Sequence, residues 1–259
     1  MHYTSIPENL GDKVYSWLEE FGHLVELFLN VFANIFRGKI NLKLTFDQMV
    51  KIGIDSLPLC LTTAAFIGMV FAIQIAGEFV RFGAGRYVGG VMSIAMAREL
   101  GPAITGIVVA ARVAAAITAE IGNMCVTEQI DALRALGAST TRYLVVPRFI
   151  AAALMMPLLT IFADVLGFLG GFMVATAFGG INSVQYLETA QNLVNSWDIY
   201  GGIIKTIIFG AIIAVIACHR GLNTKGGAKG VGEATTSSVV TTLISLFIVN
   251  YFLSVLFFK

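Results

Sequence analysis

Arg98 and Glu99 are adjacent charged residues inside a long apolar stretch, in the sequence MARELGP at residues 96–102. A charged side chain at the centre of a membrane helix costs about 2.5 to 3.5 kcal/mol on insertion scales, so such residues usually have a partner or a function. Neighbouring residues project about 100° apart around a helix, and both cannot face lipid comfortably. Two interpretations are open: the pair faces a partly hydrated cavity and contacts a polar headgroup, or it is a structural charge pair where Pro102 bends the helix.

Arg112 and Asp164 raise the same question, because each could be a partner for the other or for Glu99. For Asp164 we favour a structural role, since it stands alone among residues that pack. The three histidines are far apart, and neither a Ser-His-Asp set nor a metal-ligand spacing is present. The lysine- and glycine-rich segment at residues 224–236 does not match the phosphate-binding loop pattern. We therefore expect no catalysis, no metal and no bound nucleotide in this chain.

The segment TEQIDALRALG at residues 127–137 predicts a short surface helix that ends at Gly137. Its apolar residues share one side and its charged residues the other; these are Ile130, Ala132, Leu133 and Leu136, and Glu128, Asp131 and Arg134. It is either a docking helix that enters a groove on a soluble partner or an ordinary solvated loop helix.

The composition is that of a membrane protein. Of 259 residues, 57% are hydrophobic and 13% are charged, whereas soluble domains have about 25% charged residues. Residues 56–77, 165–187 and 234–258 contain no charged residue, and each stretch reaches or exceeds the roughly 20 residues needed to cross a bilayer. The net charge of +1 argues against a nucleic-acid partner. The three cysteines are widely spaced and indicate packing residues, and the N-terminus lacks the pattern of a removable signal peptide.

The apolar runs predict an all-α membrane protein with five spans, at about residues 56–77, 88–119, 149–178, 201–218 and 234–258. Residues 17–36 form an amphipathic pattern too short to span, so we expect an interfacial helix on the cytoplasmic surface within an N-terminal region at residues 1–45. Residues 181–200 predict a second interfacial helix, and the glycines of residues 219–233 favour a loop.

Basic residues are concentrated on one side of this topology. The N-terminal region and the segments at residues 120–148 and 219–233 contain Arg37, Lys39, Lys43, Lys51, Arg134, Arg142, Arg148, Arg220, Lys225 and Lys229. The positive-inside rule therefore places the N-terminus in the cytoplasm and the C-terminus outside.

Four blocks of the sequence, at residues 56–74, 97–137, 143–160 and 220–240, resemble the MlaE/YrbE family of ABC transporter permeases in order and spacing. The resemblance runs from about residue 46 to the C-terminus and indicates a permease domain at residues 46–259. It implies a homodimer in the bacterial inner membrane that pairs with a cytoplasmic MlaF-like ATPase and a periplasmic MlaD-like MCE-domain protein, and that moves phospholipid. ATP would be bound by the partner ATPase. The periplasmic interfacial helix then corresponds to residues 181–200.

The same resemblance implies roles for individual residues. The lipid pocket of the family maps to Phe71, Ile75, Phe79, Phe82, Arg98, Glu99 and Leu100, with Arg98 favoured for the headgroup and Glu99 for orienting Arg98. The coupling helix maps to residues 128–137, with Glu128, Asp131, Leu133, Arg134 and Gly137 as contacts to the ATPase. Glu78 departs from the apolar or small residue that relatives often have after the first span. The alternative is a secondary transporter or channel without an ATPase, but five unlike spans show no repeated halves.

Overall fold

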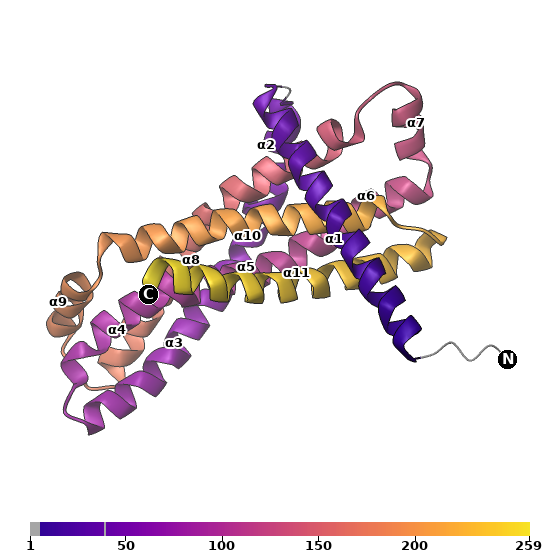
Figure 1. Cartoon of the computed structure of the whole chain (residues 1–259). Coiled ribbons are helices and arrows are strands. Elements are labelled where there is room, and N and C mark those ends of the chain that lie inside the picture. Colours follow the sequence, from indigo (N-terminus) through magenta and orange to yellow (C-terminus); the bar gives the residue numbers. More distant parts are fainter. Residues whose placement is uncertain (1–5, 39) are drawn as a thin grey trace.

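The structure, a computed structural model, describes residues 6–38 and 40–259, and every regular element within them is a helix (Figure 1). Five of these helical stretches are long and apolar enough to cross a membrane, namely Leu42–Arg81, Gly85–Val126, Thr141–Ala177, Ser196–Leu222 and Gly227–Phe258. The predictions of an all-α fold and of five spans are therefore confirmed. Residues 1–5 and Lys39 of the predicted N-terminal region lie outside the described residues.

The individual helices are α1 (Ile6–Phe36), α2 (Leu42–Ile52), α3 (Leu57–Arg81), α4 (Val88–Ala95), α5 (Gly101–Val109), α6 (Ala115–Val126), α7 (Gln129–Ala135), α8 (Val146–Ala177), α9 (Ser183–Leu193), α10 (Ser196–Leu222) and α11 (Gly227–Phe258). Three π-helical turns join neighbours without a break, at Met96–Leu100, Ala110–Ala114 and Thr141–Val145. The second span is thus one continuous helical rod made of α4, α5 and α6.

The core forms where α3, α10 and the second span pack around α8. Small residues allow this close approach, as is usual between membrane helices. A side chain at Gly68 of α3 would overlap the backbone carbonyl of Gly167 in α8, and one at Gly210 of α10 would overlap that of Ala152. The backbones of these helices are therefore in direct contact.

The first π-helical turn coincides with the MARELGP sequence. In a regular α-helix the carbonyl of Arg98 would accept a hydrogen bond from the N–H of residue 102, but Pro102 has no N–H. The turn instead ends with a wider bond from the Gly101 N–H to the Met96 carbonyl. Such π-bulges are common at functional sites and leave a backbone carbonyl for another donor.

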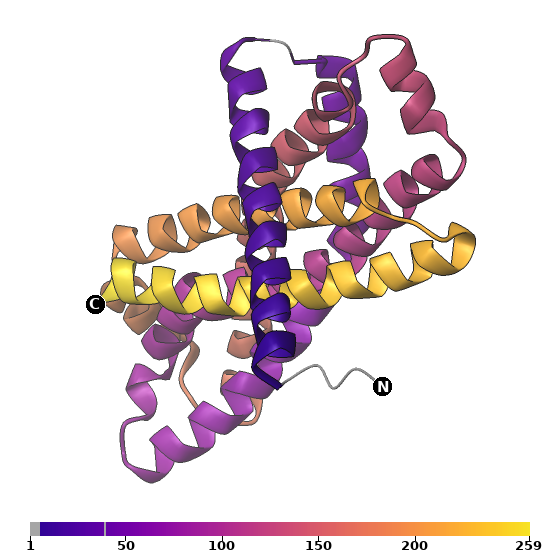
Figure 2. The same ribbon diagram turned by 45° about the vertical axis from the view of Figure 1, so that its right-hand side comes forward.

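The amphipathic helix α1 crosses the α10–α11 pair at a steep angle (Figures 1 and 2). Its Phe28 and Phe32 rings pack against Phe149 of α8, with ring centroids 6.1 and 5.6 Å apart, and its Val31 side chain is fully buried. The helix starts earlier than the predicted residues 17–36, at Ile6. This arrangement anchors one face of α1 on the span bundle.

Three boundaries differ from the prediction. Residues 219–233 are mostly helical, because α10 continues to Leu222 and α11 begins at Gly227. A glycine with positive φ, Gly226 at +88°, turns the chain there, so most of the other glycines are accommodated within a helix. The second span continues to Val126 and the third begins at Thr141, which shortens the polar segment between them.

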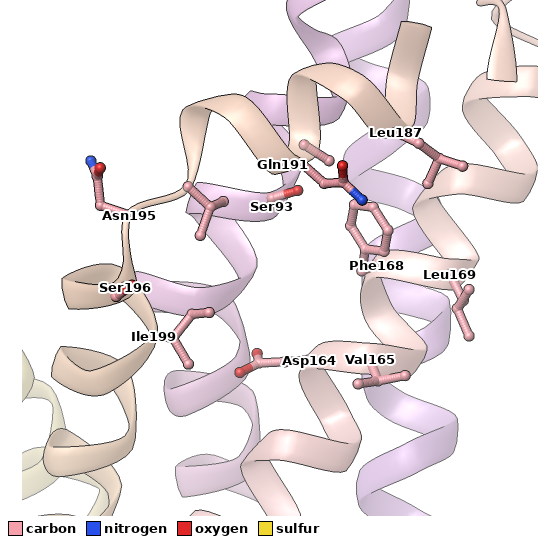
Figure 3. A pocket seen from close by; sticks show the side chains of 12 residues that line it. Ser93, Asp164, Val165, Phe168, Leu169, Leu187, Gln191, Asn195, Ser196 and Ile199 are labelled. Atoms are coloured by element: carbon pink, nitrogen blue, oxygen red, sulfur yellow. The ribbon is translucent and has the colours of Figure 1, made fainter. Parts of the chain in front are cut away.

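The predicted interfacial helix at residues 181–200 is also divided. Helix α9 ends at Leu193, and Asn195 caps a new helix, α10, whose first turn contains Trp197 and Asp198. Helix α9 packs closely on α4, where a side chain at Gly89 would overlap the Tyr186 carbonyl. A groove of about 540 Å³ lies between α8, α9 and the start of α10 (Figure 3).

Candidate functional site

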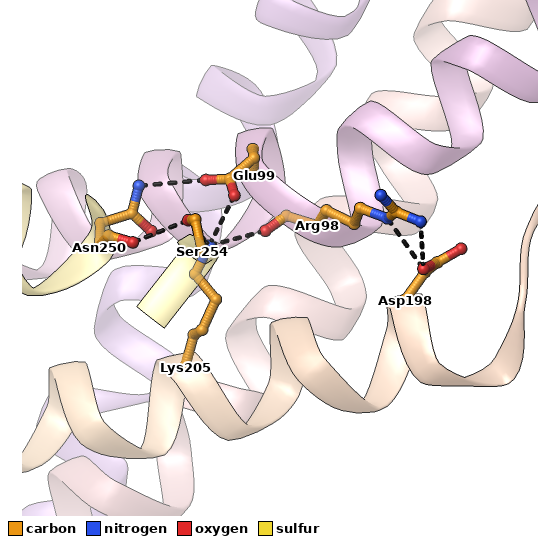
Figure 4. Close-up of polar contacts among 6 residues, drawn as sticks. All are labelled: Arg98, Glu99, Asp198, Lys205, Asn250 and Ser254. Carbon is orange, nitrogen blue, oxygen red and sulfur yellow. Dashed lines mark hydrogen bonds and ion pairs between the residues drawn. The ribbon is translucent and has the colours of Figure 1, made fainter. Parts of the chain in front are cut away.

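Six polar side chains from three spans meet beside the first π-helical turn (Figure 4). Arg98 and Glu99 come from that turn, Asp198 and Lys205 from α10, and Asn250 and Ser254 from α11. Asp198 and Lys205 are seven residues apart, so they lie two helical turns apart on one face of α10. We call these six residues the polar network.

Arg98 pairs with Asp198 at the start of α10. Its Nε and Nη2 atoms both lie 2.8 Å from the Oδ1 atom of Asp198, and the Asp198 side chain is only 2% exposed. The second oxygen of Asp198 accepts the backbone N–H of Asn195 at 2.9 Å, and the Asn195 side chain completes the capping box. One carboxylate therefore both caps α10 and holds the guanidinium.

Lys205 is fully buried and makes three polar contacts. Its Nζ atom donates to the backbone carbonyl of Arg98 at 2.9 Å and to Ser254 Oγ at 2.9 Å, and it lies 3.0 Å from Glu99 Oε1. The carbonyl of Arg98 is the group left without an α-helical donor by Pro102. Lys205 thus stabilises the irregular backbone and neutralises Glu99 at the same time.

Glu99 binds α11 through its other oxygen, which accepts from Asn250 Nδ2 at 3.1 Å. The network contains two cations and two anions, so its formal charges balance. The side chains of Arg98 and Glu99 nevertheless remain 33% and 40% exposed. The Phe258 ring lies 5.0 Å from Arg98 Cζ, a cation–π distance. The arrangement thus offers an oriented donor and an acceptor to a polar ligand in apolar surroundings.

Arg98 and Glu99 are therefore not a pair with each other, because each binds a partner on α10 or α11. Sequence reasoning missed those partners. A signal was present in residues 195–198, NSWD, which has the capping-box pattern of an N-cap Asn followed three residues later by Asp. This pattern predicts that the fourth span begins at Ser196, which places Asp198 and Lys205 on one face of the helix.

The apolar residues that were predicted to line the lipid pocket are not part of the polar network. Phe71, Ile75, Phe79 and Leu100 pack against a second apolar cluster of buried residues, which consists of Ala72, Ala76, Val88, Met92, Met96, Ala175, Ile181 and Tyr186. Phe82 follows the end of α3 and is 81% exposed. Within one chain the structure brings four of these residues to a common cluster, while Arg98 and Glu99 point toward α10 and α11.

Tyr186 of α9 is at the centre of that second cluster. Its ring lies 5.4 Å from the rings of both Phe168 and Phe172, and its side chain is fully buried. Burial raises the pKa of the Tyr186 phenol above its ordinary value. Its role in the fold is to fix α9 against α4 and α8.

The predicted coupling segment forms α7, a helix of two turns at Gln129–Ala135. Ile130 is 3% exposed and Leu133 packs on the core, whereas Asp131 and Arg134 are exposed and lie 3.3 Å apart. Leu136 ends the helix and is 83% exposed, although the sequence pattern placed it with the packed residues. An exposed leucine is thus presented beside two charges.

Glu128 and Gly137 bound this helix. Each has a positive φ, 59° for Glu128 and 72° for Gly137. A positive φ is costly for Glu128 because its side chain crowds the backbone. Both ends of α7 are therefore sharp turns.

Arg112 pairs with neither Asp164 nor Glu99, the two partners that the sequence left open. It lies 3.4 Å from Asp55 and donates to Ser56 Oγ and to the Lys51 carbonyl, which ties the second span to the region between α2 and α3. Asp164 has no hydrogen bond or ion pair within the described part of the chain.

A second polar cluster, also missed, joins α2, α6 and α8. Arg148 is 4% exposed and donates to Glu120 Oε2 at 2.8 Å and to the Leu144 carbonyl at 2.8 Å. Lys51 lies 3.3 Å from the other oxygen of Glu120. These contacts fix the end of the second span that leads into α7.

Known proteins resemble this chain along most of its length. The family model described as Permease MlaE matches residues 45–256. A probable ABC transporter permease protein of Synechocystis sp. is 47% identical over 242 residues, which cover 92% of each chain. The chloroplastic protein TRIGALACTOSYLDIACYLGLYCEROL 1 of Arabidopsis thaliana is 45% identical over 229 residues, 88% of this chain and 65% of that one. A probable ABC transporter permease protein of Rickettsia bellii is 39% identical over 255 residues, 98% of each chain.

Proposed function

The chain belongs to the MlaE permease family, and on this premise we propose that it is the membrane subunit of an ABC transporter that moves phospholipid between the bacterial inner membrane and a periplasmic MCE-domain carrier. The observation that carries the lipid assignment is the polar network, which exposes one guanidinium and one carboxylate among apolar helices. The Arabidopsis relative, whose name is that of a glycerolipid, supports a lipid substrate.

Arg98 is the residue we assign to the headgroup. A guanidinium offers two parallel N–H groups to phosphate oxygens, and such charge-assisted bonds are about twice as strong as neutral ones. Because Asp198 and the Phe258 ring hold the guanidinium in place, little side-chain entropy is lost when phosphate binds. Glu99 orients this part of the site through Lys205, which binds both Glu99 and the Arg98 backbone.

Helix α7 is proposed to couple ATP hydrolysis in a separate ATPase to this network. The second span runs without a break from the network at Met96–Leu100 to Val126, directly before α7. The Glu120–Arg148 pair joins that rod to α8. Movement of α7 would therefore displace α6 and α8 together, and the exposed Leu136 offers the apolar contact that an ATPase groove would bind.

We further propose a homodimer with the N-terminus in the cytoplasm and the C-terminus in the periplasm. Helix α11 beside the network is little buried by its own chain and exposes Phe247, Ile248, Tyr251, Phe252 and Leu256. A second copy against α11 would enclose the exposed sides of Arg98 and Glu99. The basic residues around α7 support the orientation.

Identification of the lipid that copurifies with the transporter tests this proposal. Mass spectrometry of the complex with its ATPase should find phospholipid in the wild type and at least fivefold less in Arg98→Ala. Arg86→Ala is the matched control, because Arg86 is exposed and its hydrogen bond and cation–π contact among the described residues are both with its neighbour Tyr87. The lipid bound by Arg86→Ala should equal that of the wild type. A non-phospholipid ligand, or equal phospholipid in both variants, would overturn the assignment.

A further inference from the structure

A groove lined by residues outside the polar network opens beside Asp164, Phe168 and Ile199 (Figure 3). It has a volume of about 540 Å³, which is within the range of about 300 to 1,000 Å³ for ligand pockets. Four elements contribute to its lining: α4, α8, α9 and the start of α10. None of the six network residues lines it, so an inference about this groove does not depend on the proposed function.

The walls of the groove are apolar and accessible from the surrounding membrane. Val165 and Leu169 of α8, Leu187 of α9 and Ile199 of α10 all line it and are between 44% and 52% exposed. Exposed aliphatic side chains on a membrane span face hydrocarbon chains rather than water. These walls therefore match an acyl chain that enters sideways from the bilayer.

Asp164 lies within this apolar lining and has no polar partner among the described residues. Its side chain points from α8 into the space beside Ile199 (Figure 3). Its Oδ1 atom is buried against Gly101, where a side chain at position 101 would overlap it, and makes no hydrogen bond. Its other oxygen also has no partner among the described residues, and it is the oxygen that a ligand in the groove can reach. An unpaired polar group buried in apolar surroundings is costly, and a ligand that donates a hydrogen bond to it is stabilised.

The remaining polar groups lie toward the α9 end of the groove and are neutral. They are Ser93, Gln191, Asn195 and Ser196, and the lining contains no Lys, Arg or His among the described residues. The Gln191 and Ser196 side chains make no hydrogen bond within the described part of the chain. A phosphate group here would face the Asp164 carboxyl group without a cation to balance it, whereas a hydroxyl group and ester carbonyls match these donors and acceptors.

We propose that this groove binds an uncharged, hydroxyl-bearing lipid of the diacylglycerol type, with one acyl chain along Val165, Leu169 and Ile199. The lipid hydroxyl donates to Asp164, and its ester carbonyls accept from Gln191. The groove thus selects for lipids without phosphate, in contrast to the polar network with its exposed guanidinium.

Photocrosslinking of the full-length chain in nanodiscs tests the proposal. The probe is a diacylglycerol that carries a diazirine on one acyl chain, and mass spectrometry locates the adducts. We expect adducts on Val165, Leu169 or Ile199 that excess diacylglycerol prevents and excess phosphatidic acid does not. Asp164→Leu should lower the adducts about fivefold, the effect of one lost hydrogen bond. Asp164→Asn, which keeps an acceptor, should stay within about twofold of the wild type.

Two controls separate binding in the groove from a loss of folding and from contact with bulk lipid. Gln191 is exposed, so Gln191→Leu tests the groove without disturbing the core and should lower the adducts about threefold. Adducts on Leu158, which is 46% exposed on α8 outside the groove, measure ordinary surrounding lipid and should not change. Equal groove adducts from a phosphatidic acid probe, or no change in both leucine variants, would overturn the proposal. So would loss of the adducts in the assembled complex, which would show that a partner's helix occupies the groove.

Discussion

Arg98 and Asp198 should stabilise each other strongly. A double-mutant cycle measures the coupling free energy between these two residues. We consider Arg98→Met, which keeps length and removes charge, and Asp198→Asn, which keeps shape and an acceptor. After Arg98→Met, the 2% exposed Asp198 carboxylate keeps only the Asn195 N–H as a donor among the described contacts. Breaking one side of a buried pair costs about 3 to 5 kcal/mol.

The expected loss for Arg98→Met is about 3 kcal/mol, the lower end of that range, because Arg98 is one-third exposed. In a chain of this size 1 kcal/mol corresponds to about 2 to 4 °C in Tm, so the Tm should fall by about 6 to 12 °C. Asp198→Asn should cost about 2 kcal/mol, since a charge-assisted bond becomes a neutral one. The double variant should lose about 2 kcal/mol less stability than the sum of the two single losses. This difference is within the range of coupling free energies for residues in direct contact.

Thermal unfolding of the purified chain in nanodiscs, followed by circular dichroism, provides the four values. The exposed pair of Arg81 and Glu78, 3.4 Å apart and 77% and 62% exposed, is the matched control. Its cycle with Arg81→Met and Glu78→Gln should show a coupling below about 0.5 kcal/mol. Additive losses for Arg98→Met and Asp198→Asn, within about the same 0.5 kcal/mol, would refute the conclusion that these two residues stabilise each other.

Three further predictions concern other parts of the chain. Gly68→Leu should lower the Tm by at least about 5 °C because the new side chain overlaps the backbone of α8, whereas Gly77→Leu, in open space on the same helix, should leave the Tm unchanged. Leu136→Glu should abolish stimulation of the partner ATPase by the permease without a change in Tm, because Leu136 is 83% exposed; retained stimulation would show that α7 does not couple through this residue. Arg148→Met should lower the Tm more than Lys51→Met does, because Arg148 is 4% exposed while the Lys51 side chain is 57% exposed; the reverse order would contradict the assigned role of Arg148.

The spans were predictable because a run of about 20 apolar residues has few other structural solutions. Their ends were less predictable, since short local signals decide them. The capping box at Asn195 starts α10 five residues before the apolar run suggests, and the positive φ of Gly226 allows α11 to start at Gly227 within a glycine-rich segment.

The partners in the polar network were not predictable from hydropathy. Arg98 and Glu99 were visible as anomalies, but their partners lie about 100 to 150 residues away in the chain, and tertiary packing alone brings them together. The π-helical turn at Met96–Leu100 adds to the difficulty, because it shifts the register of the side chains and no residue pattern specifies it. Only Pro102 indicated that a backbone carbonyl would need another donor.

We propose that this permease moves phospholipid by way of Arg98, and ATP-driven transfer of a labelled phospholipid is the direct test. Proteoliposomes that contain the complete transporter should transfer the lipid to its soluble carrier in an ATP-dependent manner. Arg98→Ala and Glu99→Ala should each lower the rate at least tenfold, with Arg86→Ala equal to the wild type. Transfer at the wild-type rate in both Arg98→Ala and Glu99→Ala would show that these two residues do not handle the lipid.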